Sequence, residues 1–383
     1  MLTYNHNLTL STYSDMAKRL LFIDNLRVFC IIIVILIHSA VTYSCIGSWY
    51  YTEPTAMGGF EKLFFFLFQS HAQAFSMSLF FFVSGYFIPA SLERKGVKTF
   101  ILDRLKRLGI PVLIYIFIIH PICVKLVYPQ LNIAEFTLKG FHNLDFLGST
   151  GPIWFAFALL IFSVIFAVVY KYLPSAKTNQ QISNLKVIGI IGLITLLAFG
   201  IRLIAPIGTS FYNFQFCFFA AYIVFFYLGT QASKSTILES ISLEKGKKWL
   251  SIAFGIGIPL WFFTGYVGKI MEGKMLIAGG FNAASFLYAF WESLFCVSII
   301  IALIGIAKAK YDLQNRAMKF LSENTFGIYV FHAPILIGLS ILTKDIHPGA
   351  LPKFFIIGFL TIVTSLLVAW LIRQIPVIGK IFN

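Results

Sequence analysis

Successive apolar runs, each long enough to cross a bilayer as a helix, follow one another along almost the whole chain. Hydrophobic residues make up 58% of the sequence and charged residues only 12%, so a water-soluble fold would have too little polar surface to cover itself. The runs predict an all-α, polytopic membrane bundle of about ten transmembrane helices. The expected spans lie near residues 27–47, 62–89, 108–127, 152–172, 186–205, 212–231, 249–267, 281–307, 320–342 and 353–373.

Little polar sequence remains outside these spans. Residues 1–20 are expected to form a short polar cytoplasmic segment, and residues 21–383 a single transmembrane domain. The first apolar run is longer than a signal-peptide core and no small-residue cleavage site follows it, so we expect it to stay as a helix. The five cysteines have neither metal-ligand nor disulfide spacing, which predicts no metal site.

The net charge of +15 is better explained by membrane topology than by nucleic acid, because the basic residues form short clusters between apolar runs. A cytoplasmic N-terminus places most of the 30 lysines and arginines inside, as the positive-inside rule requires. Both termini are then cytoplasmic. The exceptions, expected near outer ends, are Lys62, Lys125, Lys139, Arg202, Lys269, Lys274, Lys344 and Lys353. An outer loop near residues 128–151 is polar enough to meet a hydrophilic acceptor.

Four ionisable residues are expected at one depth in the membrane: His38, His71, Glu292 and His332. Such groups cost several kcal/mol in hydrocarbon unless they are paired or face a wet cavity, so each is a candidate functional residue. Their common depth suggests one cavity. The alternative is structural, because a membrane histidine also holds helices together by bonding a backbone carbonyl.

Arg27 and His38 lie on one face of the first helix, about three turns and roughly 16 Å apart. An arginine at the membrane boundary can bind phosphate, and a deeper imidazole can take a proton from a hydroxyl nucleophile. A long donor with a phosphorylated head and a reactive tip would span that gap. Taken alone, Arg27 is better explained as a positive-inside anchor.

Two further motifs point to a donor site. Arg104 and Arg107 are spaced to share a helix face, where they could clamp phosphate oxygens, although a topogenic basic cluster is the alternative. Ser84, Gly85 and Tyr86 place small residues in the second helix, where either a slender ligand chain or, more simply, a neighbouring helix could approach closely.

Taken together, these motifs resemble those of acyltransferase family 3. The matching runs are Leu21–Arg27 leading to His38, Phe81–Phe87, Arg104–Arg107, Gly151–Phe155 and Phe326–Pro334. The resemblance extends from residue 19 to about residue 375, and glucan succinyltransferases and surface-polysaccharide acyltransferases are the nearest subtypes. It implies a ten-helix membrane O-acyltransferase that draws acyl-CoA from the cytoplasm and modifies an extracytoplasmic glycan. It also implies Arg27 and His38 as its Arg-x10-His pair and Arg104 and Arg107 as its donor-side pair.

The sequence therefore predicts transfer of an acetyl or succinyl group from acetyl-CoA or succinyl-CoA to a glycan or polysaccharide hydroxyl, at the cell (inner) membrane. His38 is the expected base, with Glu292 or His71 orienting its imidazole and His332 lining the cavity. Membrane lipid is the expected surrounding, and no permanently bound cofactor is expected. Two alternatives remain: an exporter or flippase of a glycan or lipid-linked intermediate, and a catalytically idle membrane scaffold.

Overall fold

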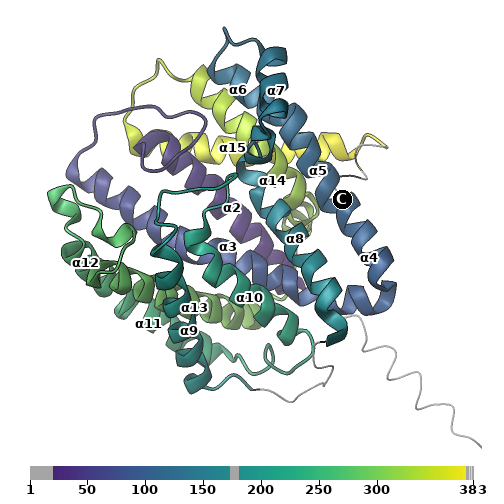
Figure 1. Ribbon diagram of the computed structural model, residues 1–383, viewed down its shortest axis with the longest axis vertical. Coiled ribbons are helices and arrows are strands. Elements are labelled where there is room, and N and C mark those ends of the chain that lie inside the picture. Colours follow the sequence, from purple (N-terminus) through teal and green to yellow (C-terminus); the bar gives the residue numbers. More distant parts are fainter. Residues whose placement is uncertain (1–19, 173–180, 377–378, 380, 382–383) are drawn as a thin grey trace, which may run out of the picture.

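The apolar runs form helices in the computed structural model, which describes residues 20–172, 181–376, 379 and 381 (Figure 1). Within these residues, nine helices are long and apolar enough to cross a membrane. They are Leu21–Ser44 (α2), Gly59–Lys95 (α3), Val97–Val127, Gly151–Tyr172, Asn184–Arg202 (α9), Leu243–Glu272, Ala283–Lys310 (α13), Arg316–Leu342 (α14) and Ala350–Arg373 (α15). A shorter apolar helix covers Phe216–Ala232. The predicted all-α polytopic architecture is confirmed, and the chain is a multi-pass membrane protein.

Three of the long helices are composite. The third is the most irregular, because π-helical turns interrupt it near Pro111 and Pro121, whose rings remove backbone donors. Its parts are α4 (Val97–Arg104), η2 (Leu105–Gly109), α5 (Ile110–Ile114), η3 (Tyr115–Ile119) and α6 (His120–Val127). The others are η5 (Gly151–Ile153), α8 (Trp154–Val169) and η6 (Tyr170–Tyr172), and then α11 (Leu243–Gly255), α12 (Gly257–Val267) and η8 (Ile270–Glu272).

Short elements connect the spans. The loop after the third span contains helix α7 (Ile133–His142), which begins where the Asn132 side chain accepts hydrogen bonds from the backbone N–H groups of Ala134 and Glu135. The remaining short elements are η4 (Asp145–Gly148), η7 (Phe216–Phe218), which leads into α10 (Phe219–Ala232), and η9 (Leu276–Ala278). Residues 1–19 of the predicted N-terminal segment lie outside the described part of the chain.

Helix α2 packs against α3, α13, α14 and α15, while α3 also packs against α10 (Figure 1). The α3–α10 crossing brings two backbones together, because a Cβ atom on Gly85 would collide with the carbonyl oxygen of Phe226, and one on Gly229 with that of Phe82. In Figure 1, α4 lies at one end of the third span, and α6 and α7 lie at the other.

Candidate active site

Two histidines from different helices meet directly. Nδ1 of His38, on α2, lies 3.0 Å from Nε2 of His332, on α14. His332 is fully buried, whereas His38 keeps part of its surface accessible. The other ring nitrogen of His332, Nδ1, lies 2.7 Å from the backbone carbonyl oxygen of Tyr329. The sequence placed these two histidines at similar depth, and the structure brings them into contact.

The hydrogen bonds around this pair fix where its protons lie. A carbonyl oxygen only accepts, so Nδ1 of a neutral His332 carries the proton and donates it to Tyr329. Nε2 of His332 then accepts, and Nδ1–H of His38 is the donor. The remaining nitrogen of His38, Nε2, keeps its lone pair. The chain of bonds therefore prepares His38 Nε2 to take up a proton.

An aromatic segment between α2 and α3 covers this histidine. The indole ring of Trp49 stacks on the imidazole of His38, with ring centroids 4.0 Å apart and planes 19° apart. Trp49 Nε1 is buried and has no hydrogen-bond partner within the described residues, although His38 lies directly beneath the ring. Trp49 was not predicted as a site residue, because it lies outside the spans where ionisable groups stand out. Its only signal was the aromatic Trp-Tyr-Tyr run directly after the first helix.

Next to Trp49, the Tyr50 hydroxyl lies 2.7 Å from Nδ1 of His120, and its ring packs edge-on against the indole. Burial raises the pKa of the Tyr50 phenol above its ordinary value, so this hydroxyl keeps its proton at neutral pH. Gly151, from the predicted Gly-Pro-Ile-Trp-Phe motif, has φ +47° and lies so close that a Cβ atom there would collide with the hydroxyls of Tyr50 and Tyr115.

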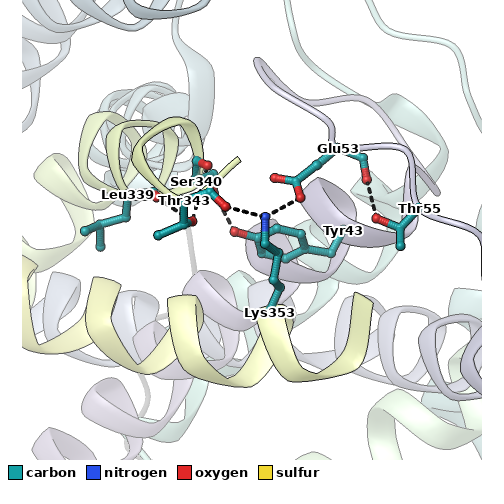
Figure 2. A network of polar contacts seen from close by, with 7 residues as sticks. All are labelled: Tyr43, Glu53, Thr55, Leu339, Ser340, Thr343 and Lys353. Atoms are coloured by element: carbon teal, nitrogen blue, oxygen red, sulfur yellow. Dashed lines mark hydrogen bonds and ion pairs between the residues drawn. The ribbon is translucent and has the colours of Figure 1, made fainter. Parts of the chain in front are cut away.

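A buried ion pair anchors the same segment (Figure 2). The Lys353 ammonium, on α15, binds a carboxylate oxygen of Glu53 and lies 2.8 Å from the carbonyl oxygen of Thr343. The backbone N–H of Glu53 also donates to the carbonyl oxygen of Thr42 at 2.8 Å. The side chains of both partners are largely buried, with exposed fractions of 5% for Lys353 and 13% for Glu53. We call residues 45–58 the strap. The ion pair of Glu53 with Lys353 fixes the strap to α15, and the backbone bond from Glu53 to Thr42 fixes it to α2.

Three arginines gather near the start of α2. Arg27 lies 3.6 Å from a carboxylate oxygen of Asp24, and its guanidinium lies 5.5 Å from the ring centroid of Phe87. Arg104 lies within the electrostatic field of both Arg107 and Arg27. The π-helical turn that begins at Leu105 changes the helical spacing on which the shared face of Arg104 and Arg107 was predicted. The charges nonetheless come together with Arg27, where an anion would relieve their repulsion.

The short motif of α3 is occupied by protein. Gly85 is the close-contact point with α10, and the neighbouring Ser84 and Tyr86 are half-buried. This geometry matches the simpler of the two interpretations, helix packing, although a part in donor binding remains a prediction.

Glu292 and His71 have other partners than His38. Glu292 accepts a hydrogen bond of 2.5 Å from the guanidinium of Arg202, which is fully buried. His71 places Nδ1 2.8 Å from the carbonyl oxygen of Leu67, and its ring packs against aromatic side chains of α13. The place predicted for Glu292 or His71, beside the imidazole of His38, is taken by His332. Depth along a helix does not decide which residues meet, because helix rotation does.

Comparisons with known proteins give a family match and distant relatives. An acyltransferase-domain family model matches residues 20–373, nearly the whole chain. Curated relatives include "Glucans biosynthesis protein C" of Salmonella gallinarum, 26% identical over 169 residues, which are 43% of this chain and 42% of the relative. The Escherichia coli protein of the same name is 26% identical over 179 residues, 44% of this chain and 45% of the relative. The chain thus covers less than half the length of these relatives. No solved structure matches it.

Proposed function

Because the chain belongs to the acyltransferase-3 family and is a membrane acyltransferase, we propose that it transfers an acetyl or succinyl group from acyl-CoA to a hydroxyl of an extracytoplasmic glycan. The His38–His332 pair is the observation that carries this proposal, since it supplies a base within the membrane domain. The name of the curated relatives favours a glucan as acceptor. The cell membrane is the proposed location.

The proposed chemistry follows from the proton positions. Nε2 of His38 takes the proton of the acceptor hydroxyl while the hydroxyl oxygen attacks the thioester carbonyl carbon. Trp49 Nε1–H, an unused donor beside the base, hydrogen-bonds the oxygen on which negative charge develops. The carbon–sulfur bond then breaks, and the proton passes from His38 to the departing CoA thiolate. The products are an ester on the glycan and free CoA.

In this proposal, the donor binds at the end of the third span where α4 lies. Arg27, Arg104 and Arg107 present positive charge there, and guanidinium groups bind phosphate oxygens with charge-assisted hydrogen bonds. Arg27 and His38 lie on one uninterrupted helix, α2, so the phosphate-binding end and the base are held at a fixed separation.

Proteoliposomes containing the purified protein test this function. Labelled succinyl-CoA or acetyl-CoA is supplied on one side and a soluble glucan oligosaccharide on the other, and label in the glucan is measured. The wild-type protein should label the glucan and release CoA, and the His38→Ala variant should not. Glucan that crosses the membrane while the thioester stays intact would instead support the exporter.

A further inference from the structure

A small cavity lies at the end of the third span opposite Arg104. Its volume is about 130 Å³, and it opens between η3, α6, α7 and η4. One wall is aromatic: the rings of Phe117 and Phe146 stack with centroids 5.9 Å apart, and Phe136 stacks with the imidazole of His120 at 6.0 Å. Flat, partly exposed aromatic faces at a cavity wall suit a ligand that has a flat apolar face of its own.

The rest of the lining combines Ile116, Pro121 and Gly140 with polar side chains. Asp145 and Lys139 stand at the exposed rim, and Thr137 and Ser149 lie half-buried below it. The Lys139 ammonium is 2.7 Å from a carboxylate oxygen of Glu135, and the Thr137 hydroxyl donates to the carbonyl oxygen of Ile133 at 2.8 Å, which leaves the Asp145 carboxylate as the charged group that faces a ligand. A few convergent polar groups on an aromatic wall are typical of a site for a small polar ligand.

This cavity is connected to the histidine pair through the strap. His120, which lines the cavity, places Nδ1 2.7 Å from the Tyr50 hydroxyl. The Tyr50 ring packs edge-on on Trp49 with centroids 5.3 Å apart, and Trp49 stacks on His38. The cavity and the base are thus separated by the side chains of two consecutive residues of the strap.

We propose that this cavity is the acceptor subsite and binds one sugar ring of the glycan. A sugar ring presents an apolar C–H face to the aromatic wall and hydroxyl groups to Asp145, Ser149 and His120. Because Trp49 and Tyr50 separate the cavity from His38, another sugar of the same glycan presents the hydroxyl that is acylated, and the exposed rim lets the chain leave the cavity. This assignment rests on the proposed function, and it adds that the acceptor is bound at the end of the third span opposite the donor.

The test uses two variants and one matched control in the proteoliposome assay. Asp145→Asn removes the charge and keeps the shape, and Phe136→Ala removes one aromatic face. Both should raise the acceptor KM for the glucan oligosaccharide about tenfold while kcat and the donor KM stay unchanged, because they remove uniform binding. Leu138→Ala, an exposed position on the same helix that does not line the cavity, should leave all three constants unchanged.

A binding measurement separates this inference from the proposed function. Ser149→Cys is made in a Cys45→Ser background, since Cys45 is the exposed member of the five native thiols. The glucan should slow alkylation of the introduced thiol at least several-fold, and glycerol should not. Unchanged acceptor KM in both variants, or no protection, overturns the cavity as the subsite. Protection without any acyl transfer keeps the subsite and refutes the proposed function.

Discussion

At the scale of single residues, the proton positions in the histidine pair make a prediction about rate. Replacing His38 with alanine or glutamine should lower kcat by about 10² to 10⁴, the usual effect of losing a general base. Acylation is measured per folded protein, because a structural histidine would lower yield instead. A base must also be neutral, so wild-type activity should fall as the pH drops through the pKa of this imidazole. Near-normal specific activity in His38→Ala would exclude it as the base.

Trp49 gives a second prediction, because its stacking and its N–H can be separated. Trp49→Phe keeps an aromatic ring over His38 and loses the buried N–H, so kcat should fall about 10²-fold, with the donor KM unchanged. Trp49→Ala removes both and should be at least as damaging. If Trp49→Phe has wild-type kcat, the indole contributes only by stacking, and the oxyanion donor is another group.

At the scale of elements, the strap is held by the buried Glu53–Lys353 ion pair. A single substitution removes one partner of this pair, and a double substitution removes both charges. Lys353→Met leaves the Glu53 carboxylate buried without its partner, which should cost about 3–5 kcal/mol of stability. Since Trp49 is then no longer held over His38, kcat should also fall. The double variant Glu53→Gln with Lys353→Met should recover most of the stability. Thermal unfolding in detergent and acylation rates measure these effects.

The control for this prediction is Lys344→Met, which removes an exposed lysine close to Thr343 in the sequence. It should change neither quantity. A Lys353→Met protein as stable and as active as the wild type would show that the ion pair does not hold the strap.

Elements also show how far the sequence could predict this protein. Apolar length predicted most spans to within about six residues, because hydrocarbon thickness sets the length of each helix, but the third span begins at Val97, eleven residues before its predicted start at residue 108. Apolar length also predicted the shorter helix Phe216–Ala232 as a span near residues 212–231, but it could not predict the π-helical turns of the third span. Contacts between side chains of different helices were harder to predict from the sequence. His38 and His332 were placed at one depth, but the Arg202–Glu292 pair and the Trp49 contact depend on helix rotation and loop path, which hydropathy does not encode.

At the scale of the whole molecule, the basic residues predict which way the bundle faces. Single cysteines near Lys139 and Lys274 should react with an impermeant thiol reagent from outside, and ones near Lys98 and Lys247 should not. Each is labelled in intact cells and again after permeabilisation, which shows that the hidden thiols are reactive. Labelling in the opposite sense would place the cavity beside α7 in the cytoplasm and the three arginines outside.

The uninterrupted helix α2 has one more consequence, because its length determines how long a donor must be. Arg27 and His38 are fixed roughly 16 Å apart, so only a donor whose arm matches that length can bind its phosphate and reach the base together. A truncated thioester such as an N-acetylcysteamine derivative should react with a high KM that Arg104→Ala with Arg107→Ala leaves unchanged. The same double variant should raise the KM of full-length acyl-CoA. If the double variant raises the KM of both donors equally, the distance between Arg27 and His38 does not select the donor by its length.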